Sequence, residues 1–198
     1  MPPDPSLGRG ENPGAHGDPA RGVVSSRRRA LERLRDAVGG GKTGPVLITG
    51  EPGSGKTWLA RRLVEDLPWG WRALTVAVSS AWDARELLQA IGHGLGWTMP
   101  NRHAAARRAI AAALQDEAHD GRGWLLILDD AQRSSPAVWE EIHALTNQLG
   151  RPGGFAMLIL LGATELFRHL TRHPGSTVSS SLRTASRRHL QCWRGRRG

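Results

Sequence analysis

The sequence predicts an α/β fold in which helices cover both faces of a mostly parallel β-sheet. From residue 45 to residue 170, short and continuously apolar runs alternate with longer segments whose apolar residues recur at helical spacing. Continuous apolar character is typical of strands buried on both faces, and regular strand–helix alternation gives parallel strands joined by right-handed crossovers. A chain of 198 residues with 39% apolar residues is long enough to bury one core.

The individual elements follow from the same patterns. Four strands are expected, over residues 45–49, 72–78, 124–128 and 155–161. Helices are expected over residues 27–38, 58–67, 83–95, 102–118, 134–149 and 165–172, and Asp83 caps the third of them. The chain therefore divides into three parts: a disordered N-terminal segment (residues 1–25), one core domain (26–170) and a basic, unstructured tail (171–198).

The formal charge of +9 is unevenly placed along the chain. Residues 1–45 carry 8 basic and 5 acidic side chains, residues 46–170 carry 12 and 13, and residues 171–198 carry 7 and none, so the three parts contribute +3, −1 and +7. The core is nearly neutral, which leaves nucleic acid as a weakly supported partner. The single cysteine excludes an internal disulfide framework, and with no apolar leader and no apolar run near the roughly 20 residues that span a bilayer, we expect a cytoplasmic protein without a membrane span.

Residues 50–57 match the phosphate-loop pattern G-x-x-x-x-G-K-[ST]. Glycines let successive backbone N–H groups point at a phosphate, and the helix that follows adds the positive end of its dipole. Lys56 is expected to reach the β- and γ-phosphates, and the Thr57 hydroxyl to bind Mg²⁺. The residues expected to bind the nucleotide here are Gly50, Glu51, Pro52, Gly53, Ser54, Gly55, Lys56, Thr57 and Trp58. A second G-K-T, at residues 41–43, lacks the earlier glycine and precedes a strand, so we interpret it as a simple turn.

Polar residues follow two of the expected strands. The strand at 124–128 ends in Asp129 and Asp130, and we expect it to lie beside the phosphate loop, where Asp129 joins Thr57 at Mg²⁺. Asp130 is then placed to orient or deprotonate the attacking water; the alternative is an acidic pair that merely ends a strand. Thr164 follows the strand at 155–161 and could sense the γ-phosphate, or equally cap the next helix.

Together these motifs resemble the AAA+ P-loop ATPases, which have a three-layer P-loop NTPase fold. Over residues 27–170 the chain is similar to bacterial ATPases related to general secretion pathway protein A and to their transposon-encoded relatives. The matching stretches are V-L-I-T-G-E-P-G-S-G-K-T (46–57), A-R-E-L-L-Q-A-I-G-H-G-L-G (84–96), L-L-I-L-D-D-A-Q (125–132) and L-I-L-L-G-A-T-E-L (158–166). The resemblance implies ATP and Mg²⁺ as ligands, an ATP-driven conformational switch in a homo-oligomer with a neighbouring subunit's arginine at the site, secretion or transposition proteins as partners, and Gln132 near the site.

The chain also departs from the pattern of these ATPases. Asp130 replaces the usual glutamate, Ala163 replaces a polar residue after Leu-Gly, and Trp58 is bulky where smaller residues are usual. Residues 171–198 carry neither a fifth strand nor a helical lid, so we predict a truncated or frame-shifted end. His169, His173, His189 and Cys192, near the C-terminal end of the sequence, are interpreted as scattered residues rather than a zinc site.

The sequence thus predicts an ATPase that binds Mg-ATP and converts ATP and water to ADP and phosphate, with Lys56 and Asp130 as its catalytic residues. One alternative is a nucleotide-binding regulatory or adaptor module with little or no turnover, which the shortened acid and the missing lid favour. A second alternative is a DNA-associated ATPase of transposition or replication.

Overall fold

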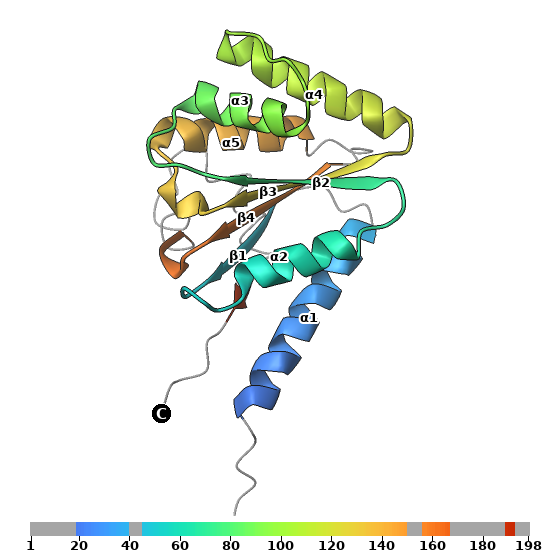
Figure 1. Cartoon of the computed structure of the whole chain (residues 1–198), viewed down its shortest axis with the longest axis vertical. Coiled ribbons are helices and arrows are strands. Elements are labelled where there is room, and N and C mark those ends of the chain that lie inside the picture. Colours follow the sequence, from blue (N-terminus) through green and yellow to red (C-terminus); the bar gives the residue numbers. More distant parts are fainter. Residues whose placement is uncertain (1–18, 40–44, 150–155, 167–188, 193–198) are drawn as a thin grey trace, which may run out of the picture.

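Five parallel strands form one sheet between two layers of helices (Figure 1). The computed structural model describes residues 19–39, 45–149, 156–166 and 189–192. The elements in chain order are α1 (Pro19–Gly39), β1 (Val46–Gly50), α2 (Lys56–Glu65), β2 (Trp71–Ala77), α3 (Ala84–Gly94), α4 (His103–His119), β3 (Gly123–Asp129), the 3-10 turn η1 (Ala131–Arg133), α5 (Pro136–Leu149), β4 (Ala156–Gly162) and β5 (His189–Cys192). The strand order is β2-β3-β4-β1-β5, and every pair is parallel.

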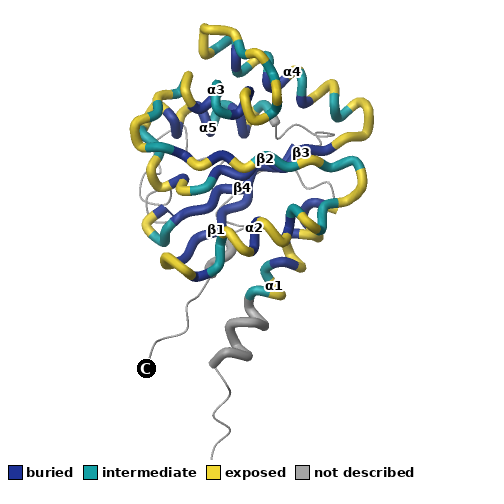
Figure 2. Tube along the Cα trace, in the orientation of Figure 1, coloured by how far each residue is buried: buried dark blue, intermediate teal, exposed yellow. Residues whose placement is uncertain are grey.

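Two apolar clusters, one on each face of the sheet, hold the layers together. Helices α3, α4 and α5 cover one face and α1 and α2 the other, as Figure 1 shows. Successive residues of β1 alternate between the clusters: Leu47 packs with α3–α5, while Val46 and Ile48 pack with α1 and α2. The inner strands are therefore buried along their length (Figure 2), which confirms the predicted three-layer α/β fold.

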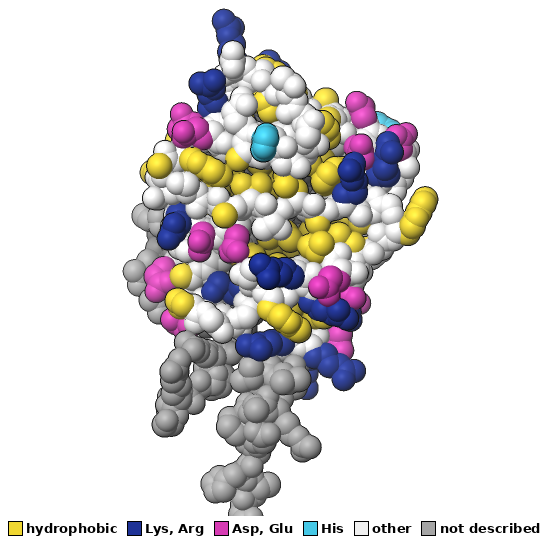
Figure 3. Space-filling model, in the orientation of Figure 1, with side chains coloured by type: hydrophobic (Ala, Val, Ile, Leu, Met, Phe, Trp, Pro, Cys, Tyr) yellow, Lys and Arg dark blue, Asp and Glu magenta, His cyan; other side chains and the backbone are white. Residues whose placement is uncertain are grey.

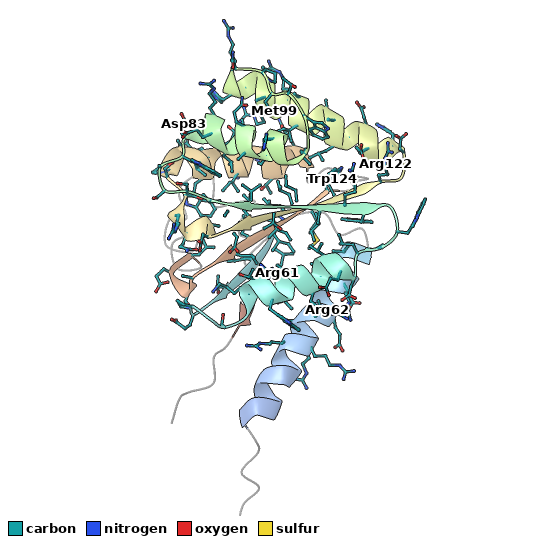
Figure 4. The ribbon with its side chains drawn as sticks, in the orientation of Figure 1. Arg61, Arg62, Asp83, Met99, Arg122 and Trp124 are labelled. Carbon is teal, nitrogen blue, oxygen red and sulfur yellow. The ribbon has the colours of Figure 1, made fainter. Side chains whose placement is uncertain are left out.

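Local signals in the sequence placed most elements to within two residues. Asp83 is the N-cap of α3, and a reciprocal pair of hydrogen bonds forms a capping box: Glu86 N donates to Asp83 Oδ1 at 2.8 Å, and Asp83 N donates to Glu86 Oε2 at 2.7 Å. Trp124 and Trp139 lie in the core, and the Trp124 ring packs edge-on against Trp97 below the helical layer (Figure 4).

Helix α1 corrects the predicted N-terminal boundary. It begins at Pro19, so residues 19–25 are helical, whereas the sequence predicts disorder over residues 1–25. Proline fits the first turn of a helix because its missing N–H is not needed there. Leu31 and Leu34 anchor the helix in the core, and a helix that is already anchored can extend by one hydrogen bond for each residue added.

Strand β5 corrects the prediction that residues 171–198 are wholly unstructured and hold no fifth strand. Residues His189–Cys192 pair in parallel with β1, from Leu47 opposite His189 to Gly50 opposite Cys192. The pairing uses main-chain groups on the edge of β1 that β4 leaves unpaired, so it needs no strong apolar pattern in the strand that adds to it. The predictions for residues 1–18, 171–188 and 193–198, and for His169 and His173, lie outside the described residues.

Candidate functional site

The phosphate loop connects the end of β1 to the start of α2. Its turn depends on Gly53 (φ 74°) and Gly55 (φ 92°), which adopt the left-handed conformation that other residues avoid. Gly55 is also the N-cap of α2, and no side chain of the described residues caps the first N–H groups of that helix. The loop and the helix N-terminus therefore present backbone donors that suit an anion.

Lys56 lies at the inner side of this loop. Its Nζ donates to the carbonyl oxygens of Gly50 at 2.8 Å and Glu51 at 3.1 Å, so the loop curls around the ammonium group. Ser54 is 1% exposed, and its Oγ has no hydrogen-bond partner among the described residues. An ammonium held inside the curl of the loop and an enclosed, unsatisfied hydroxyl both fit a loop built to receive a phosphate.

Thr57 and Asp129 come together although 72 residues separate them in the chain. Thr57 Oγ1 donates to Asp129 Oδ2 at 3.4 Å, while Asp129 Oδ1 accepts from the backbone N–H of Asp130 at 2.9 Å. Both oxygens of Asp129 are thereby oriented. A hydroxyl and a carboxylate are oxygen donors of the kind Mg²⁺ prefers, so the residues present fit that ion.

The strand that carries Asp129 does not lie beside the phosphate loop as predicted. β4 is inserted between β1 and β3, so the predicted neighbour relation is wrong. Asp129 still reaches Thr57, because the parallel strands end at the same edge of the sheet and α2 begins there (Figure 1).

Asp130 turns the chain sharply out of β3. With φ 55° it is the only non-glycine residue at positive φ among those that the structure describes, and Asp tolerates this conformation better than most residues. Its Oδ1 accepts from Gln132 Nε2 at 3.0 Å, and its Oδ2 lies 3.9 Å from Arg133 Nε. The Asp130 carboxylate is thus held at the edge of the site by Gln132 and Arg133, which belong to the turn that follows it.

Gln132 links the ends of β3 and β4. While its Nε2 donates to Asp130, its Oε1 accepts from the backbone N–H of Ala163 at 3.2 Å. Thr164 Oγ1 donates to Glu51 Oε1 at 3.4 Å, so the start of the phosphate loop is tied to the same strand end. Thr164 itself lies in the helical turn 164–166, and it therefore does not precede the helix as a cap.

Two contributions to the site are not predicted from the sequence. Gln132 was placed near the site by resemblance, but its bridging bonds were not expected. The sequence predicts Arg27 only as the start of a helix, yet its Nη2 donates to Ser54 O at 3.1 Å. A signal was available: Arg27 lies four and seven residues before the buried Leu31 and Leu34, on the apolar stripe of α1.

Trp58, which was expected to bind the nucleotide, contributes less to this geometry. The side chain of Trp58 is 53% exposed on the first turn of α2, so it does not belong to the core. The turn at residues 41–43 lies outside the described residues. Among the side chains that are described, no group of three or more His, Cys, Asp or Glu residues could hold a metal ion by itself.

The marked pKa shifts occur away from the site. Burial between helices raises the pKa of Glu141, which pairs with Arg107 at 3.3 Å. A hydrogen bond from Arg35 holds the pKa of Asp66 below its ordinary value. Arginines and acids are mixed over the face that carries α2 (Figure 3), in agreement with a nearly neutral core. None of the described helices is both long and apolar enough to cross a bilayer.

A family model matches most of the chain. The family model described as AAA domain matches residues 40–170. General secretion pathway protein A of Aeromonas hydrophila is 28% identical over 135 residues, which are 66% of this chain and 24% of that protein. The chain thus spans about a quarter of the length of this relative.

Solved structures share the fold at low sequence identity. The ORC2 protein of Aeropyrum pernix matches with a TM-score of 0.59 and 20% identity, over 86% of this chain and 47% of that one. Cdc6p of Pyrobaculum aerophilum matches with a TM-score of 0.60 and 18% identity, over 84% and 45%. The chain covers about half of each of these structures, and at such identities the likeness concerns the fold.

Proposed function

Since this chain belongs to the AAA domain family, we propose that it binds Mg-ATP on residues 50–57 and hydrolyses it. The observation that carries the proposal is the 3.4 Å contact between Thr57 Oγ1 and Asp129 Oδ2 beside a curled phosphate loop. In the A. pernix ORC2 protein, a structural relative, the solved complexes contain ADPNP and ADP. Their fold supports the same ligand class here.

Each residue has a distinct role in the proposed reaction. Backbone N–H groups of the loop and the Lys56 ammonium bind the β- and γ-phosphates, while Thr57 and Asp129 would hold Mg²⁺. The ion, when bound, neutralises phosphate charge. Asp130 orients a water and accepts its proton as the water oxygen bonds to the γ-phosphorus; the bond from that phosphorus to the β–γ bridging oxygen breaks, releasing ADP and phosphate.

The chain offers a matched control for the binding test. Lys56→Ala should abolish binding of a fluorescent ATP analogue, because the loop loses its only side-chain cation. Lys42→Ala changes the lysine of the other G-K-T tripeptide and should leave the dissociation constant unchanged. Equal affinity of the two variants would refute the assignment of residues 50–57.

Hydrolysis is tested separately from binding. Asp130→Asn should bind ATP with wild-type affinity but release phosphate at least about tenfold more slowly, because the amide cannot accept the proton. Asp129→Asn should instead weaken the dependence of nucleotide binding on Mg²⁺, which titration with and without EDTA measures. Undiminished phosphate release by the Asp130 variant would remove that residue from the mechanism.

A nucleotide-binding module without turnover is the second candidate. The observation that favours it is that Asp130, one methylene shorter than glutamate, is engaged by Gln132 and faces Arg133. This candidate predicts tight ATP binding with no Mg²⁺-dependent phosphate release by the wild type.

The biological setting belongs to the same proposal. We place the chain in the cytoplasm as an ATP-driven switch of a homo-oligomer, in secretion or transposition machinery, and its similarity to general secretion pathway protein A supports the first of these. Light scattering with and without ATP measures the molar mass of the particles and therefore tests whether the chain forms a homo-oligomer. DNA association, the third reading, requires ATP-dependent and salt-sensitive binding that survives deletion of residues 171–198.

A further inference from the structure

Arg27 contacts the phosphate loop from outside. It lies on α1, and its Nη2 donates to the carbonyl oxygen of Ser54 at 3.1 Å, across 27 residues of chain. The guanidinium also lies against Gly55: a Cβ placed there would be 3.1 Å from Cζ, Nε and Nη2 of the arginine. Arg27 therefore binds the backbone of the loop, and it can approach this closely because Gly55 has no side chain.

The hydrogen bond from Arg27 determines the orientation of the Ser54–Gly55 peptide. In a trans peptide the carbonyl of Ser54 and the N–H of Gly55 point in opposite directions. Because Arg27 holds the carbonyl on the side of α1, the N–H of Gly55 is directed to the opposite side of the loop. The positive charge on the carbonyl side also polarises the peptide, which makes this N–H a stronger donor to an anion.

Arg27 is placed differently from its neighbours on α1. Arg28 and Arg29 are exposed, and Arg28 pairs with Glu32 at 3.1 Å. Arg27 instead extends the buried stripe of Leu31 toward the loop, and its Nε is enclosed without a partner among the described residues. An enclosed and unpaired donor on a charged group costs free energy, so its position calls for a compensating role.

We propose that Arg27 is a positioning residue of the nucleotide site, which holds the Ser54–Gly55 peptide so that the Gly55 N–H faces the bound phosphates. The proposal rests on the proposed function, because it concerns the same loop. It makes α1 part of the site: a movement of α1 away from α2 would release the peptide and weaken phosphate binding. The effect concerns the phosphates alone, and it should be the same for every ligand that fills the loop.

The test compares three ligands and two arginines of one helix. Affinities for ATP, ADP and inorganic tripolyphosphate are measured in competition with a fluorescent nucleotide on the full chain. Arg27→Ala should weaken all three by about tenfold, the effect expected for one charge-assisted hydrogen bond. Arg27→Lys keeps a cationic donor of similar reach and should stay within about threefold of the wild type. Arg29→Ala removes the same charge from an exposed position and should change nothing.

The outcomes separate this proposal from the function on which it rests. If the wild type binds no nucleotide, both fail; if it binds and Lys56→Ala abolishes binding, the function stands and Arg27 is tested alone. Equal affinities of the Arg27→Ala and Arg29→Ala variants would refute the positioning role. A loss for ATP with none for tripolyphosphate would also refute it, since that result assigns Arg27 to the base or ribose. Circular dichroism establishes folding, and Arg27→Gln replaces the alanine variant if the latter unfolds.

Discussion

Replacing Gln132 with leucine removes both ends of the bridge between Asp130 and Ala163 while nearly conserving side-chain size. The lost hydrogen bonds are Nε2 to Asp130 Oδ1 at 3.0 Å and Ala163 N to Oε1 at 3.2 Å. Both are open to solvent, so each is worth about 0.5–1 kcal/mol, at the low end for a hydrogen bond. We expect Gln132→Leu to lower the free energy of unfolding by about 1–2 kcal/mol.

The same substitution should affect turnover more than binding. If Gln132 holds Asp130 in place in the transition state, losing about 1.4 kcal/mol slows phosphate release about tenfold. The dissociation constant for ATP should stay within about twofold, because the bridge touches neither Lys56 nor the loop N–H groups. Urea unfolding, nucleotide titration and phosphate release at saturating Mg-ATP measure the three quantities.

A second variant separates the two bonds. Gln132→Glu keeps an acceptor for the Ala163 N–H but puts a negative charge beside the Asp130 carboxylate. It should therefore slow turnover at least as much as leucine does, through repulsion rather than through loss of the strand contact. Wild-type stability and wild-type turnover in both variants would refute the reasoning. A loss of stability alone would limit the bridge to a structural role.

Three further predictions concern the scaffold. Gly162→Ala should lower the free energy of unfolding, measured in urea, by about 1–3 kcal/mol, because the new Cβ lies 2.4 Å from a leucine methyl carbon. Gly39→Ala is the control, since a Cβ at Gly39 meets nothing within 4 Å. Equal stabilities of the two variants would contradict the packing at the end of β4. Leu34 is 1% exposed, so Leu34→Ala should lower the free energy of unfolding by about 2–5 kcal/mol. A decrease of less than about 0.5 kcal/mol would mean that α1 does not pack on the sheet. Asp66→Asn should destabilise the protein at neutral pH, because Arg35 lowers the folded-state pKa of Asp66. The difference in unfolding free energy should persist above the unfolded pKa of about 3.9 and vanish as pH falls through the lower folded value, and a pH-independent difference would rule out the ion pair as its cause.

The features predicted well from sequence are those whose cause is local. The alternation of apolar runs and amphipathic segments places most strands and helices within a few residues, because side-chain periodicity reports burial directly. The N-cap of α3 at Asp83 is likewise a local signal, since an aspartate directly precedes the helical pattern. The phosphate loop is a contiguous motif, so its glycines and Lys56 could be identified without any knowledge of the sheet.

The features that were missed depend on contacts across long stretches of chain. The bond between Arg27 and Ser54 and the bridge from Gln132 to Ala163 join elements that periodicity does not connect. The four residues of β5 have too little pattern for a prediction, since their pairing with β1 comes from backbone groups that every residue carries.

The parallel sheet covered on both faces and the phosphate loop follow from local signals in the sequence, because apolar periodicity and glycine spacing act within a few residues of one another. The strand order, in contrast, depends on long-range packing, which inserts β4 between β1 and β3. Any buried parallel strand can satisfy its neighbour's main-chain hydrogen bonds, so these bonds do not determine which strands are neighbours. The strand order depends instead on how all the helices pack against the sheet together. That choice brings Thr57, Asp129 and Ala163 to one edge of the sheet.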